Sequence, residues 1–331
     1  MSILSGILSL ALILTGCDKS GEPASSSPAA ADEKYTIAVV VKIVGIPFFN
    51  VFEDGVKRAS SELGVNGYVT GPTEADPAQQ VKIVEDLINS DVDAIVVVPN
   101  DATALEPVLG RARQKGIVVI ANESPDQEGA NADVEMIDNK KFAEAAAESL
   151  AKASGGSGGY VIYVGGLSVP LHNTWADIAR DYLASNYPNL KEVTDRIPCG
   201  EDAELAYTRT RELLTTYPDL AGILGFGSLG PIGAAQALKE RNLAGKVAVV
   251  GNVTPEMAAP YLKEGSITEG YLWNPADSGF ASVFAAKHLL ENKPINDIDI
   301  PGIGKPAITG NTLAFDATLV ITADNALSLG F

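Results

Sequence analysis

The chain is poor in the residues on which most catalytic and metal sites depend. It has two histidines and two cysteines among 331 residues. A His-rich metal site is therefore excluded, and His172 is left as the one candidate for His-based catalysis, because we expect His288 to lie on the surface. The sequence contains no P-loop, no nucleophile elbow, no paired-histidine metal motif and no Gly-x-Gly-x-x-Gly after a strand. We predict a protein that is not an enzyme and that needs no cofactor and no metal.

Basic residues are also scarce. The 24 Lys and Arg are outnumbered by 42 Asp and Glu, which gives a formal net charge of −18 and a pI of about 4.5. No basic stripe is present, so we expect no nucleic-acid partner, and the acidic surface disfavours polyanionic ligands. The remaining composition, with 46% apolar residues, is that of a globular protein. The length favours two domains.

Long hydrophobic runs are missing apart from Ile3–Leu14, which is too short to span a bilayer comfortably. It ends in Leu14-Thr15-Gly16-Cys17 and resembles a bacterial lipoprotein signal, although no Lys or Arg precedes it. We predict a signal peptide over residues 1–16, a lipidated Cys17, and a flexible Ser/Pro/Ala tether over residues 17–34. An ordinary signal peptide followed by a free cysteine is the alternative. If Cys17 is acylated, Cys199 has no partner for a disulfide, and we expect it to be a buried, inert thiol.

Past residue 34 the sequence alternates between strand-like and helix-like segments. Helix signals are clear at residues 77–89, where Asp76 is an N-cap, Pro77 stands at the first helical position and Gln79 follows three residues after the cap. The other expected helices are 49–63, 103–115, 140–152, 173–186, 203–215, 231–241, 255–263 and 277–291. The expected strands are 35–41, 67–70, 94–98, 118–121, 133–136, 160–164, 192–197, 221–224, 247–250 and 267–272, with a flexible glycine-rich turn at 154–159.

This alternation predicts an α/β protein with two similar doubly wound parallel-sheet lobes joined by a hinge. The βαβα pattern runs over residues 35–138 and starts again at residue 139. We assign residues 35–138 and about 274–300 to the N-terminal lobe, and residues 139–273 and about 301–331 to the C-terminal lobe. The segment from Ile295 to Phe331 has no strong helical period, so its short runs could pair with either lobe. A ligand cleft is expected between the lobes.

The stretch Tyr35–Leu63 shows how such a cleft would be built. A β-branched apolar run ends at Lys42, and a helix with apolar residues at helical spacing begins near Phe49. The carboxyl ends of parallel strands are where α/β proteins bind ligands. A lysine that ends a buried strand needs a partner, so we place Lys42 in the cleft. Phe49 fits the helix core as well as it fits a cleft wall.

Polar and aromatic residues follow most of the other expected strands. Together with Lys42, Phe48 and Phe49, the candidate ligand-binding residues are Asn100, Asp101, Asn122, Glu123, His172, Asn173, Trp175, Phe226, Ser228, Asn252, Trp273, Asn274 and Asp277. Amides, carboxylates and aromatic faces suit a small neutral polyol, because they bind hydroxyl groups and pack on the C–H faces of a sugar ring.

Several of these residues have a structural alternative. Asp101 could instead cap the next helix, as could Thr254 before Pro255. Glu123 could be a solvated loop charge, and Trp175 could pack beneath its own helix.

The chain resembles the type I periplasmic binding proteins of ABC sugar importers, the ribose-like family. The resemblance covers residues 35–331 and is carried by Pro47-Phe48-Phe49, Asp54-Gly55, Asp93-Ala94-Ile95, Asn100-Asp101, Gly116–Ile120, Gly251-Asn252 and Thr254-Pro255. Within the family, Val41–Gly45, Gly71–Glu74 and Leu272–Pro275 resemble the branch that binds rhamnose and autoinducer-2.

The resemblance implies a two-lobed protein that closes on its ligand by hinge bending and delivers it to an ABC permease. It implies polar ligand contacts at Lys42 and Glu123, ring-packing aromatics at Phe48 and Phe49, and a closing wall at Trp273 and Asn274. The autoinducer branch has an acid and an amide where this chain has Leu171 and His172, and Pro and Ala where it has Phe226 and Ser228. The ribose proteins have an Arg at Ser124 and an Asp near Val253. These differences favour rhamnose or another neutral monosaccharide over ribose and autoinducer-2.

We also expect a monomer that is held to the membrane by its N-terminal lipid alone. Asp18 resembles the signal that keeps lipoproteins at the inner membrane, which would place the protein on its periplasmic face in a Gram-negative cell. A signal or chemoreceptor component that binds autoinducer-2 is the alternative function. An exported sugar-modifying enzyme that uses Glu123 and His172 is a remote one.

Overall fold

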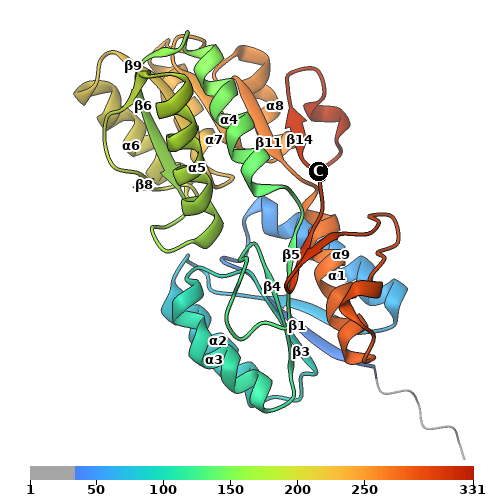
Figure 1. Ribbon diagram of the computed structural model, residues 1–331. Coiled ribbons are helices and arrows are strands. Elements are labelled where there is room, and N and C mark those ends of the chain that lie inside the picture. Colours follow the sequence, from blue (N-terminus) through green and yellow to red (C-terminus); the bar gives the residue numbers. More distant parts are fainter. Residues whose placement is uncertain (1–33) are drawn as a thin grey trace, which may run out of the picture. The chain divides into compact units, whose positions relative to one another are not determined.

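The computed structural model describes residues 34–331, so the predicted signal peptide, Cys17 and almost all of the tether lie outside the described residues. Two β-sheets organise the described chain (Figure 1). The first has the strand order β12-β13-β5-β4-β3-β1-β2. Its strands are β1 (Thr36–Val40), β2 (Asn66–Thr70), β3 (Ala94–Val97), β4 (Val118–Asn122), β5 (Ala132–Glu135), β12 (Ala307–Thr309) and β13 (Thr312–Ala314).

The second sheet repeats the arrangement with the order β14-β11-β10-β9-β6-β7, and β8 also pairs with β6. Its strands are β6 (Ser157–Val164), β7 (Asn189–Glu192), β8 (Ile197–Pro198), β9 (Leu220–Gly225), β10 (Ala248–Asn252), β11 (Glu269–Leu272) and β14 (Leu319–Ile321). Both sheets are parallel except at one edge, where β12 and β14 run antiparallel to their neighbours. The predicted α/β fold with two parallel-sheet lobes is therefore confirmed, with an antiparallel strand at one edge of each sheet.

Helices connect the strands of both sheets. They are α1 (Pro47–Leu63), α2 (Pro77–Ile88), α3 (Ala102–Gln114), α4 (Asn139–Ala153), α5 (Pro170–Asn186), α6 (Ala203–Thr216), α7 (Gly230–Glu240), α8 (Pro255–Glu264) and α9 (Pro275–Leu290), with short 3-10 turns at Ile295–Asp297 and Ala326–Ser328. Alternate residues of β1 pack on α1 from one face and on α2 and α3 from the other, as the continuous apolar run predicts. None of the described helices is long and apolar enough to cross a membrane.

Helix α9 belongs to the first lobe although it follows the last parallel strand of the second. It packs along α1, where glycines allow a close approach. A Cβ on Gly55 would lie 1.8 Å from the carbonyl oxygen of Ala276, and a Cβ on Gly279 would lie 2.2 Å from that of Phe52. Any larger residue at either glycine would push the two helices apart.

The chain passes between the lobes at three places. These are residues 136–138 between β5 and α4, residues 273–274 between β11 and α9, and residues 315–318 between β13 and β14. The first and third run side by side: the Phe315 N–H donates to the Glu135 carbonyl at 2.7 Å, and the Ala317 N–H to the Met136 carbonyl at 3.0 Å. We call these three segments the hinge.

The structure corrects the second lobe boundary. Residues 301–331 were assigned to the C-terminal lobe, but β13 pairs with β5, so residues 307–314 complete the first sheet. Only β14 and the residues after it return to the second sheet. Three-residue edge strands carry too little periodicity to be assigned from sequence. The sequence pattern of residues 295–331 is compatible with pairing to either lobe, and the structure shows that its strands pair with both.

Two local predictions in the second lobe are also wrong. The strand expected over residues 192–197 is split into β7, which ends at Glu192, and the two-residue β8. Part of the expected glycine-rich turn belongs to β6, which begins at Ser157. Glycine fits there because side chains of the lobe cover the strand: a Cβ on Gly159 would lie 2.7 Å from a Val193 methyl group. His288, expected at the surface, is buried and contacts the Pro294 carbonyl oxygen through Nε2 at 2.8 Å.

Candidate functional site

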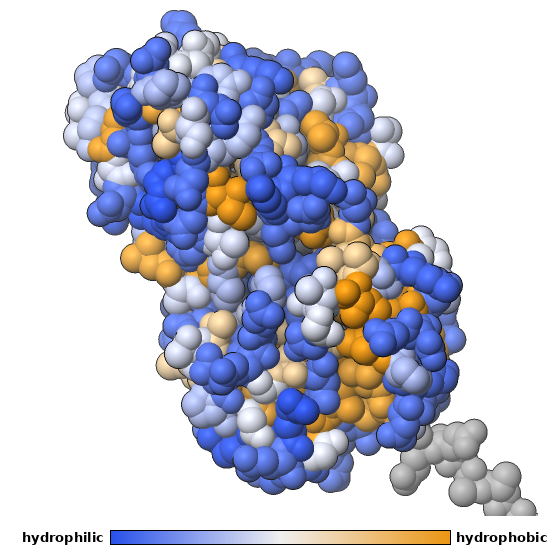
Figure 2. Space-filling view, viewed as in Figure 1, coloured by the Kyte–Doolittle hydropathy of each residue, from blue (hydrophilic) through white to orange (hydrophobic). Residues whose placement is uncertain are grey.

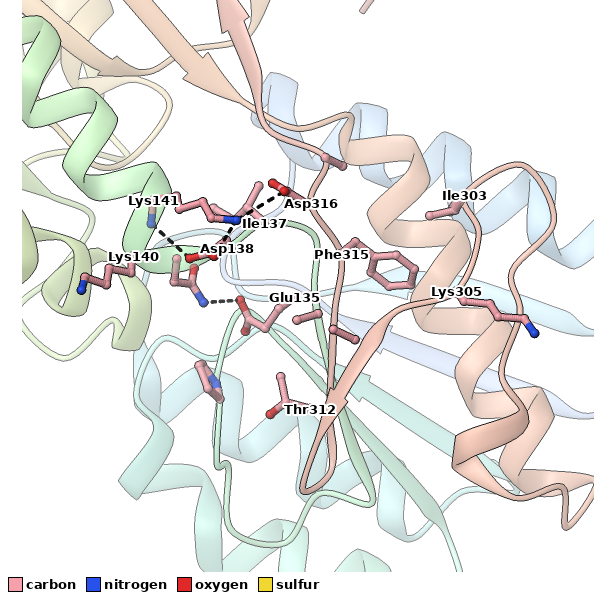
Figure 3. A pocket seen from close by; sticks show the side chains of 15 residues that line it. Glu135, Ile137, Asp138, Lys140, Lys141, Ile303, Lys305, Thr312, Phe315 and Asp316 are labelled. Atoms are coloured by element: carbon pink, nitrogen blue, oxygen red, sulfur yellow. Dashed lines mark hydrogen bonds and ion pairs between the residues drawn. The ribbon is translucent and has the colours of Figure 1, made fainter.

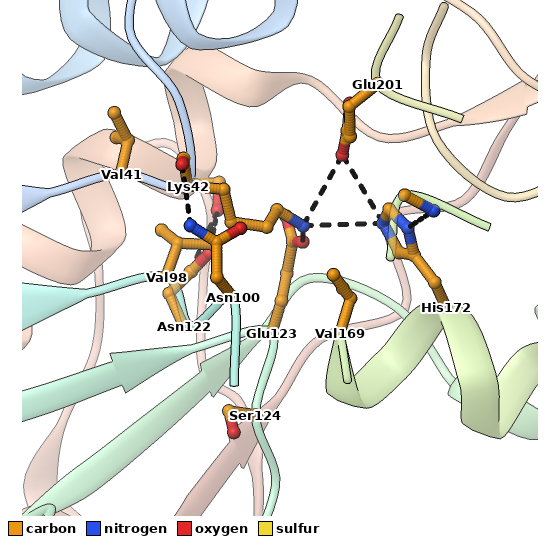
Figure 4. Close-up of polar contacts among 12 residues, drawn as sticks. Val41, Lys42, Val98, Asn100, Asn122, Glu123, Ser124, Val169, His172 and Glu201 are labelled. Atoms are coloured by element: carbon orange, nitrogen blue, oxygen red, sulfur yellow. Dashed lines mark hydrogen bonds and ion pairs between the residues drawn. The ribbon is translucent and has the colours of Figure 1, made fainter. Parts of the chain in front are cut away.

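Lys42 lies at the carboxyl end of β1 and is 2% exposed. Its ammonium donates to Glu123 Oε2 at 2.8 Å and lies 3.9 Å from Glu201 Oε1 and 5.9 Å from the centre of the Phe49 ring (Figure 4). Burying a lysine is unfavourable unless opposite charges surround it. The two carboxylates come from different lobes, so Lys42 holds a charge cluster that spans the cleft.

Glu123 reaches this position through an unusual backbone conformation. It directly follows β4 and has φ = 58°, in the left-handed region that non-glycine residues seldom adopt. Such a conformation costs on the order of 1 kcal/mol or more, and residues held in it cluster at functional sites. The turn directs one carboxylate oxygen to Lys42 and leaves the other, Oε1, without a hydrogen-bond partner among the described residues.

His172 presents a defined face to the same cluster. The Gly165 backbone N–H donates to its Nδ1 at 2.9 Å, so Nδ1 is unprotonated and a neutral ring carries its proton on Nε2. Burial and the neighbouring Lys42 charge hold the pKa of His172 well below its usual range, so the ring is neutral at physiological pH. The protonated Nε2 lies 3.4 Å from Lys42 Nζ and 3.8 Å from Glu201 Oε1, which is beyond hydrogen-bond distance of that carboxylate, so its N–H is a donor that a ligand could use.

Glu201 was not predicted from the sequence. It follows β8 and is 9% exposed, and the loop that carries it was obscured by the wrongly placed strand at residues 192–197. Burial raises its pKa to about 7, opposed by Lys42 and reinforced by Glu123. Recognising that a strand ends near residue 198 would have pointed to Glu201, because the residues after the other strands supply the site.

Three aromatic rings form the apolar wall of the site. Phe48 packs edge-on against Phe49 at 5.0 Å between ring centres and against Trp273 at 5.9 Å. The two phenylalanines stand in the first turn of α1, while Trp273 stands in the hinge after β11. Rings in this arrangement suit the C–H face of a small ligand. The ring of Phe48 therefore contacts that of Trp273, which follows the last parallel strand of the second sheet.

Between these groups lies a small buried cavity. It is lined by Lys42, Phe48, Phe49, Glu123, His172, Glu201, Gly227, Ser228, Asn252, Leu272 and Trp273. The empty space measures about 260 Å³, most of it too narrow for a water molecule, which is just under the ~300 Å³ of the smallest ordinary ligand pockets.

The polar atoms around the cavity are incompletely satisfied. Glu123 Oε1, Ser228 Oγ, Asn252 Oδ1 and Trp273 Nε1 are buried and have no hydrogen-bond partner in the described chain. Unpaired buried polar groups cost about 1–3 kcal/mol each, and proteins keep few of them without a reason. Two of these atoms are acceptors, Trp273 Nε1–H is a donor, and the Ser228 hydroxyl can be either. Such a set matches the hydroxyl groups of a neutral polyol.

Gly227 brings the second lobe close to the cavity. It has φ = 124°, and a Cβ there would lie 2.7 Å from the Gly200 carbonyl carbon and oxygen. Only glycine fits this conformation and this approach. The turn therefore fixes the neighbouring Ser228 and the loop that carries Glu201 in one arrangement.

Eight of the predicted ligand-binding residues line this cavity, and the other eight lie outside it: Asn100, Asp101, Asn122, Asn173, Trp175, Phe226, Asn274 and Asp277. Several of the latter shape the site from behind. Asn100 donates from Nδ2 to the Lys42 carbonyl at 2.7 Å, and its backbone N–H donates to the Gln80 side chain at 2.8 Å. Gln80 in turn donates to the Val41 and Val98 carbonyls, so the ends of β1 and β3 are tied together.

Caps and lobe contacts account for most of the others. Asp101 caps α3 through the Ala104 N–H, and Asn274 caps α9 through the Ala276 N–H. Asp277 pairs with Arg58 of α1. In contrast, Thr254 makes no cap hydrogen bond to α8, so its predicted capping role is wrong.

The remaining four make contacts inside the lobes. Asn122 donates to the Val134 carbonyl and to the hydroxyls of Ser278 and Ser282, which joins β4 to β5 and α9. Asn173 donates to the Gly166 and Val169 carbonyls. Trp175 and Phe226 are fully buried with their rings 5.8 Å apart, and Trp175 stacks on the His172 ring at 5.6 Å. Trp175 thus packs beneath its own helix α5, which was the structural alternative to a ligand contact.

The site carries no strong net charge. One lysine pairs with Glu123, and burial raises the pKa of the neighbouring Glu201 to about 7. Cys199 near the site is buried, and burial raises the pKa of its thiol to about 12, so it is inert as predicted. No group of three His, Cys, Asp or Glu side chains within residues 34–331 is arranged to hold a metal ion. The arrangement suits reversible binding of a neutral ligand.

Comparison with known proteins gives a consistent match. The family model described as the periplasmic binding protein domain matches residues 37–294. The D-ribose/D-allose-binding protein of Pseudomonas aeruginosa is 32% identical over 278 residues, which cover 80% of this chain and 85% of that protein. The ribose import binding protein of Bacillus subtilis is 26% identical over 88% of this chain and 94% of that protein.

Solved structures agree on the fold. The LsrB protein of Clostridium saccharobutylicum in complex with AI-2 superposes with a TM-score of 0.82 at 21% identity, over 89% of this chain and all of that one. A solute-binding protein of Clostridium phytofermentas with bound L-rhamnose also gives 0.82, at 23% identity over 89% of this chain and 98% of that one. At these identities the likeness concerns the fold alone.

Proposed function

This chain belongs to the periplasmic binding protein family, and on that premise we propose that it captures one neutral monosaccharide in the cleft at Lys42 and delivers it to an ABC permease. The family acts outside the cytoplasm. The proposal rests on one observation above all. A cavity with an aromatic wall contains unpaired buried acceptors at Glu123 and Asn252 and an unpaired donor at Trp273.

A monosaccharide would satisfy this set of groups. Each hydroxyl of a sugar can donate and accept, so it can pair with the acceptors at Glu123 and Asn252 and with the donors at His172 and Trp273. The ring would pack on Phe48, as small-molecule sites combine apolar walls with a few directed polar groups. Sugar acids and phosphates would instead add negative charge beside Glu123 and Glu201, which we expect the site to reject.

The identity of the sugar is less constrained than the sequence suggested. Rhamnose was favoured because Leu171 and Phe226 offered an apolar neighbour for a methyl group. Neither residue lines the cavity, and both are packed in the second lobe. The apolar contacts available are Leu272 and the aromatic wall. We therefore propose an aldose in the size range of D-ribose, D-allose and L-rhamnose, sugars that relatives and structural neighbours are named for binding.

A thermal-shift screen tests this proposal. The panel should contain D-ribose, D-allose, L-rhamnose, autoinducer-2 and, as anionic controls, the matching sugar acids and phosphates. A ligand that binds only the folded protein stabilises it by mass action and so raises Tm. At a free ligand concentration of one hundred times Kd, the free energy of unfolding increases by about 2.7 kcal/mol. We expect at least one neutral aldose to raise Tm and none of the anions to do so. If only autoinducer-2 raises Tm, the protein is a signal receptor.

We also propose that Cys17 anchors the mature protein to the membrane surface by its lipid, next to the permease. Metabolic labelling with a palmitate analogue in a bacterial host should mark the wild-type protein and spare the Cys17→Ser variant. Labelling that persists in the variant would contradict the anchor. Loss of sugar uptake on deletion of the gene would support delivery to a permease, while intact uptake would favour the receptor function.

A further inference from the structure

A second pair of buried acids lies at the hinge, outside the binding cavity. Asp133 and Glu135 stand two residues apart on β5, so their side chains share one face of the strand. Both are buried. The Ser124 N–H donates to Asp133 Oδ1 at 3.2 Å, whereas Asp133 Oδ2 and Glu135 Oε1 have no donor among the described residues. Two buried carboxyl groups on one strand face, with no cation beside them, favour sharing one proton because two negative charges would repel there.

The other oxygen of Glu135 connects the pair to the second lobe. Asn139 Nδ2 donates to Glu135 Oε2 at 2.9 Å, and Asn139 Oδ1 accepts the Trp175 indole N–H at 2.8 Å. Trp175 stacks on the His172 ring at 5.6 Å and 22° between planes. A continuous path of contacts therefore runs from the last residue of β5, across the hinge, to a donor in the binding cavity. We call it the hinge relay.

An open groove flanks the relay on the hinge side (Figure 3). Its empty volume is about 1210 Å³ including open solvent, and Glu135, Asn139 and Phe315 are among the residues that line it. Lys141 pairs with Asp138 at 3.1 Å and with Asp316 at 3.5 Å, which ties α4 to the third hinge segment. Water in the groove can therefore reach the edge of the acid pair.

Charged groups surround the pair on both sides. Glu123 and Asp126, from the loop after β4, add negative charge from within the first lobe. The groove contributes Asp138, Lys140, Lys141, Lys305 and Asp316. No cation contacts Asp133 or Glu135 within the described residues, in contrast to the lysine that balances the cleft acids. A proton on the pair would lower the energetic cost of burying Asp133 and Glu135, because it removes one of their two negative charges.

We propose that Glu135 and Asn139 are positioning residues for the binding site: while the acid pair keeps its shared proton, the hinge relay holds Trp175 and thereby sets the His172 donor against the ligand. This inference rests on the proposed function for its effect on binding, but not for the relay itself. When the shared proton leaves to solvent, two adjacent buried carboxylates repel, Glu135 turns into the groove, and Asn139 loses its acceptor.

The pH at which this occurs follows from the environment. Burial, followed by the Asp133 charge, raises the pKa of Glu135 well above its usual range, and burial raises that of Asp133 to about 6. The pair therefore keeps a proton to higher pH than ordinary carboxyl groups do. The relay weakens as pH rises and this proton is lost. The sequence offers a spectroscopic probe for this change, because Trp175 and Trp273 are its only tryptophans.

The test uses the full chain labelled with ¹⁵N on the indole nitrogens, titrated from pH 7 to 10 without sugar. The Trp273→Phe variant assigns the two indole N–H signals. In the wild type we expect the Trp175 signal to shift as pH rises. In Glu135→Gln, which keeps the hydrogen bonds but cannot ionise, it should stay fixed. In Asn139→Ala it should be displaced at every pH. Lys305→Met, in the groove but off the relay, should behave as wild type.

Binding provides the second readout. With the sugar identified by the screen, Asn139→Ala should raise Kd about tenfold, which corresponds to about 1.4 kcal/mol. Glu135→Gln should stay within about twofold of wild type at pH 7 and lose the alkaline weakening. A Trp175 signal that ignores pH in the wild type, or that moves equally in Glu135→Gln, would overturn the relay. If no sugar binds, the proposed function fails while the indole titration still decides the relay.

Discussion

The cleft and the hinge both bury two carboxylates, and they stabilise them in different ways. In the cleft, Lys42 supplies a fixed positive charge to Glu123 and Glu201. At the hinge, no cation contacts Asp133 or Glu135 within residues 34–331, and in our proposal the pair shares a proton instead. In the cleft the lysine lies beside carboxylates that can accept hydrogen bonds from a ligand, although burial still raises the pKa of Glu201 to about 7. A shared proton keeps the hinge pair neutral enough to be buried, but makes it sensitive to pH.

The same contrast appears in the neutral polar groups. The cleft leaves Ser228 Oγ, Asn252 Oδ1 and Trp273 Nε1 without protein partners, whereas the hinge amide, Asn139, is paired at both ends. The polar groups of the cleft are therefore available to a ligand, whereas the hydrogen bonds of Asn139 already stabilise the folded protein. Substitutions should separate the two regions: cleft changes should affect binding more than stability. Figure 2 shows that this face of the molecule is largely hydrophilic, with hydrophobic residues gathered in several groups.

Removing the lysine should have the largest effect, because the cleft would then hold acids without a cation, as the hinge does. Breaking a buried pair by removing one partner costs about 3–5 kcal/mol. We expect Lys42→Met to lower the free energy of unfolding by that order, measured by urea denaturation, and to abolish sugar binding. Lys82→Met is the matched control, since Lys82 pairs with Asp86 on an exposed helix face and its loss should change stability by less than about 1 kcal/mol. Equal losses in the two variants would contradict the role of Lys42.

The next largest effect concerns pH. The pKa of Glu201 rises from 4.5 to about 7 on folding, so the folded state binds this proton more tightly than the unfolded state. Its contribution to stability is present below pH 4.5 and is lost as pH rises through about 7. The shift corresponds to roughly 3 kcal/mol. Urea denaturation between pH 5 and 8 should show stability falling in the wild type and falling less in Glu201→Gln. If the free energy of unfolding changes equally with pH in the wild type and in Glu201→Gln, then burial does not raise the pKa of Glu201 as described.

A smaller effect should separate binding from stability. Asn252→Ala removes an unpaired buried acceptor, so the ligand-free protein should be as stable as wild type or slightly more stable. The sugar would lose one hydrogen bond, worth about 0.5–1.5 kcal/mol, and Kd should rise up to about tenfold by calorimetry. Asn122→Ala is the contrasting variant: it removes a fully paired buried amide and should lower stability by a kcal/mol or more. A destabilised Asn252→Ala protein would indicate that Asn252 is structural.

The smallest effect is expected at Ser228. Its hydroxyl is unpaired and can serve as donor or acceptor, so a sugar hydroxyl or a water molecule can replace its role in part. We expect Ser228→Ala to raise Kd only a few-fold and to leave Tm without sugar unchanged. A loss of binding as large as that of Lys42→Met would place the ligand closer to the second lobe than the cavity suggests.

Much of the fold could be predicted from the sequence because parallel strands buried on both faces are continuous apolar runs. β1 and β3 were placed within a residue or two, and the cap of α2 at Asp76 was confirmed. The edge strands β12, β13 and β14 were not found, because three half-buried residues carry no distinctive period. Their pairing is decided by tertiary contacts, which is why residues 307–314 were assigned to the wrong lobe.

The site was predicted in part for a related reason. Residues that directly follow a correctly predicted strand line the cavity in several cases, as Lys42 and Glu123 do. Glu201 was not predicted because the strand before it, β8, was predicted in the wrong place. Phe226 also follows a strand, but it is buried beneath the site. Sequence position shows that a residue lies near the edge of the sheet, but side-chain direction decides whether it faces the cavity.

The most direct test of the central claim is calorimetric titration of the wild-type protein at pH 7 with the neutral aldose that raises Tm most. We predict a single site per chain, a Kd in the micromolar range or tighter, and weaker binding in Asn252→Ala without loss of stability. A titration in which no neutral aldose binds, or in which binding is indifferent to both Lys42→Met and Asn252→Ala, would contradict the assignment of this cleft as a sugar site.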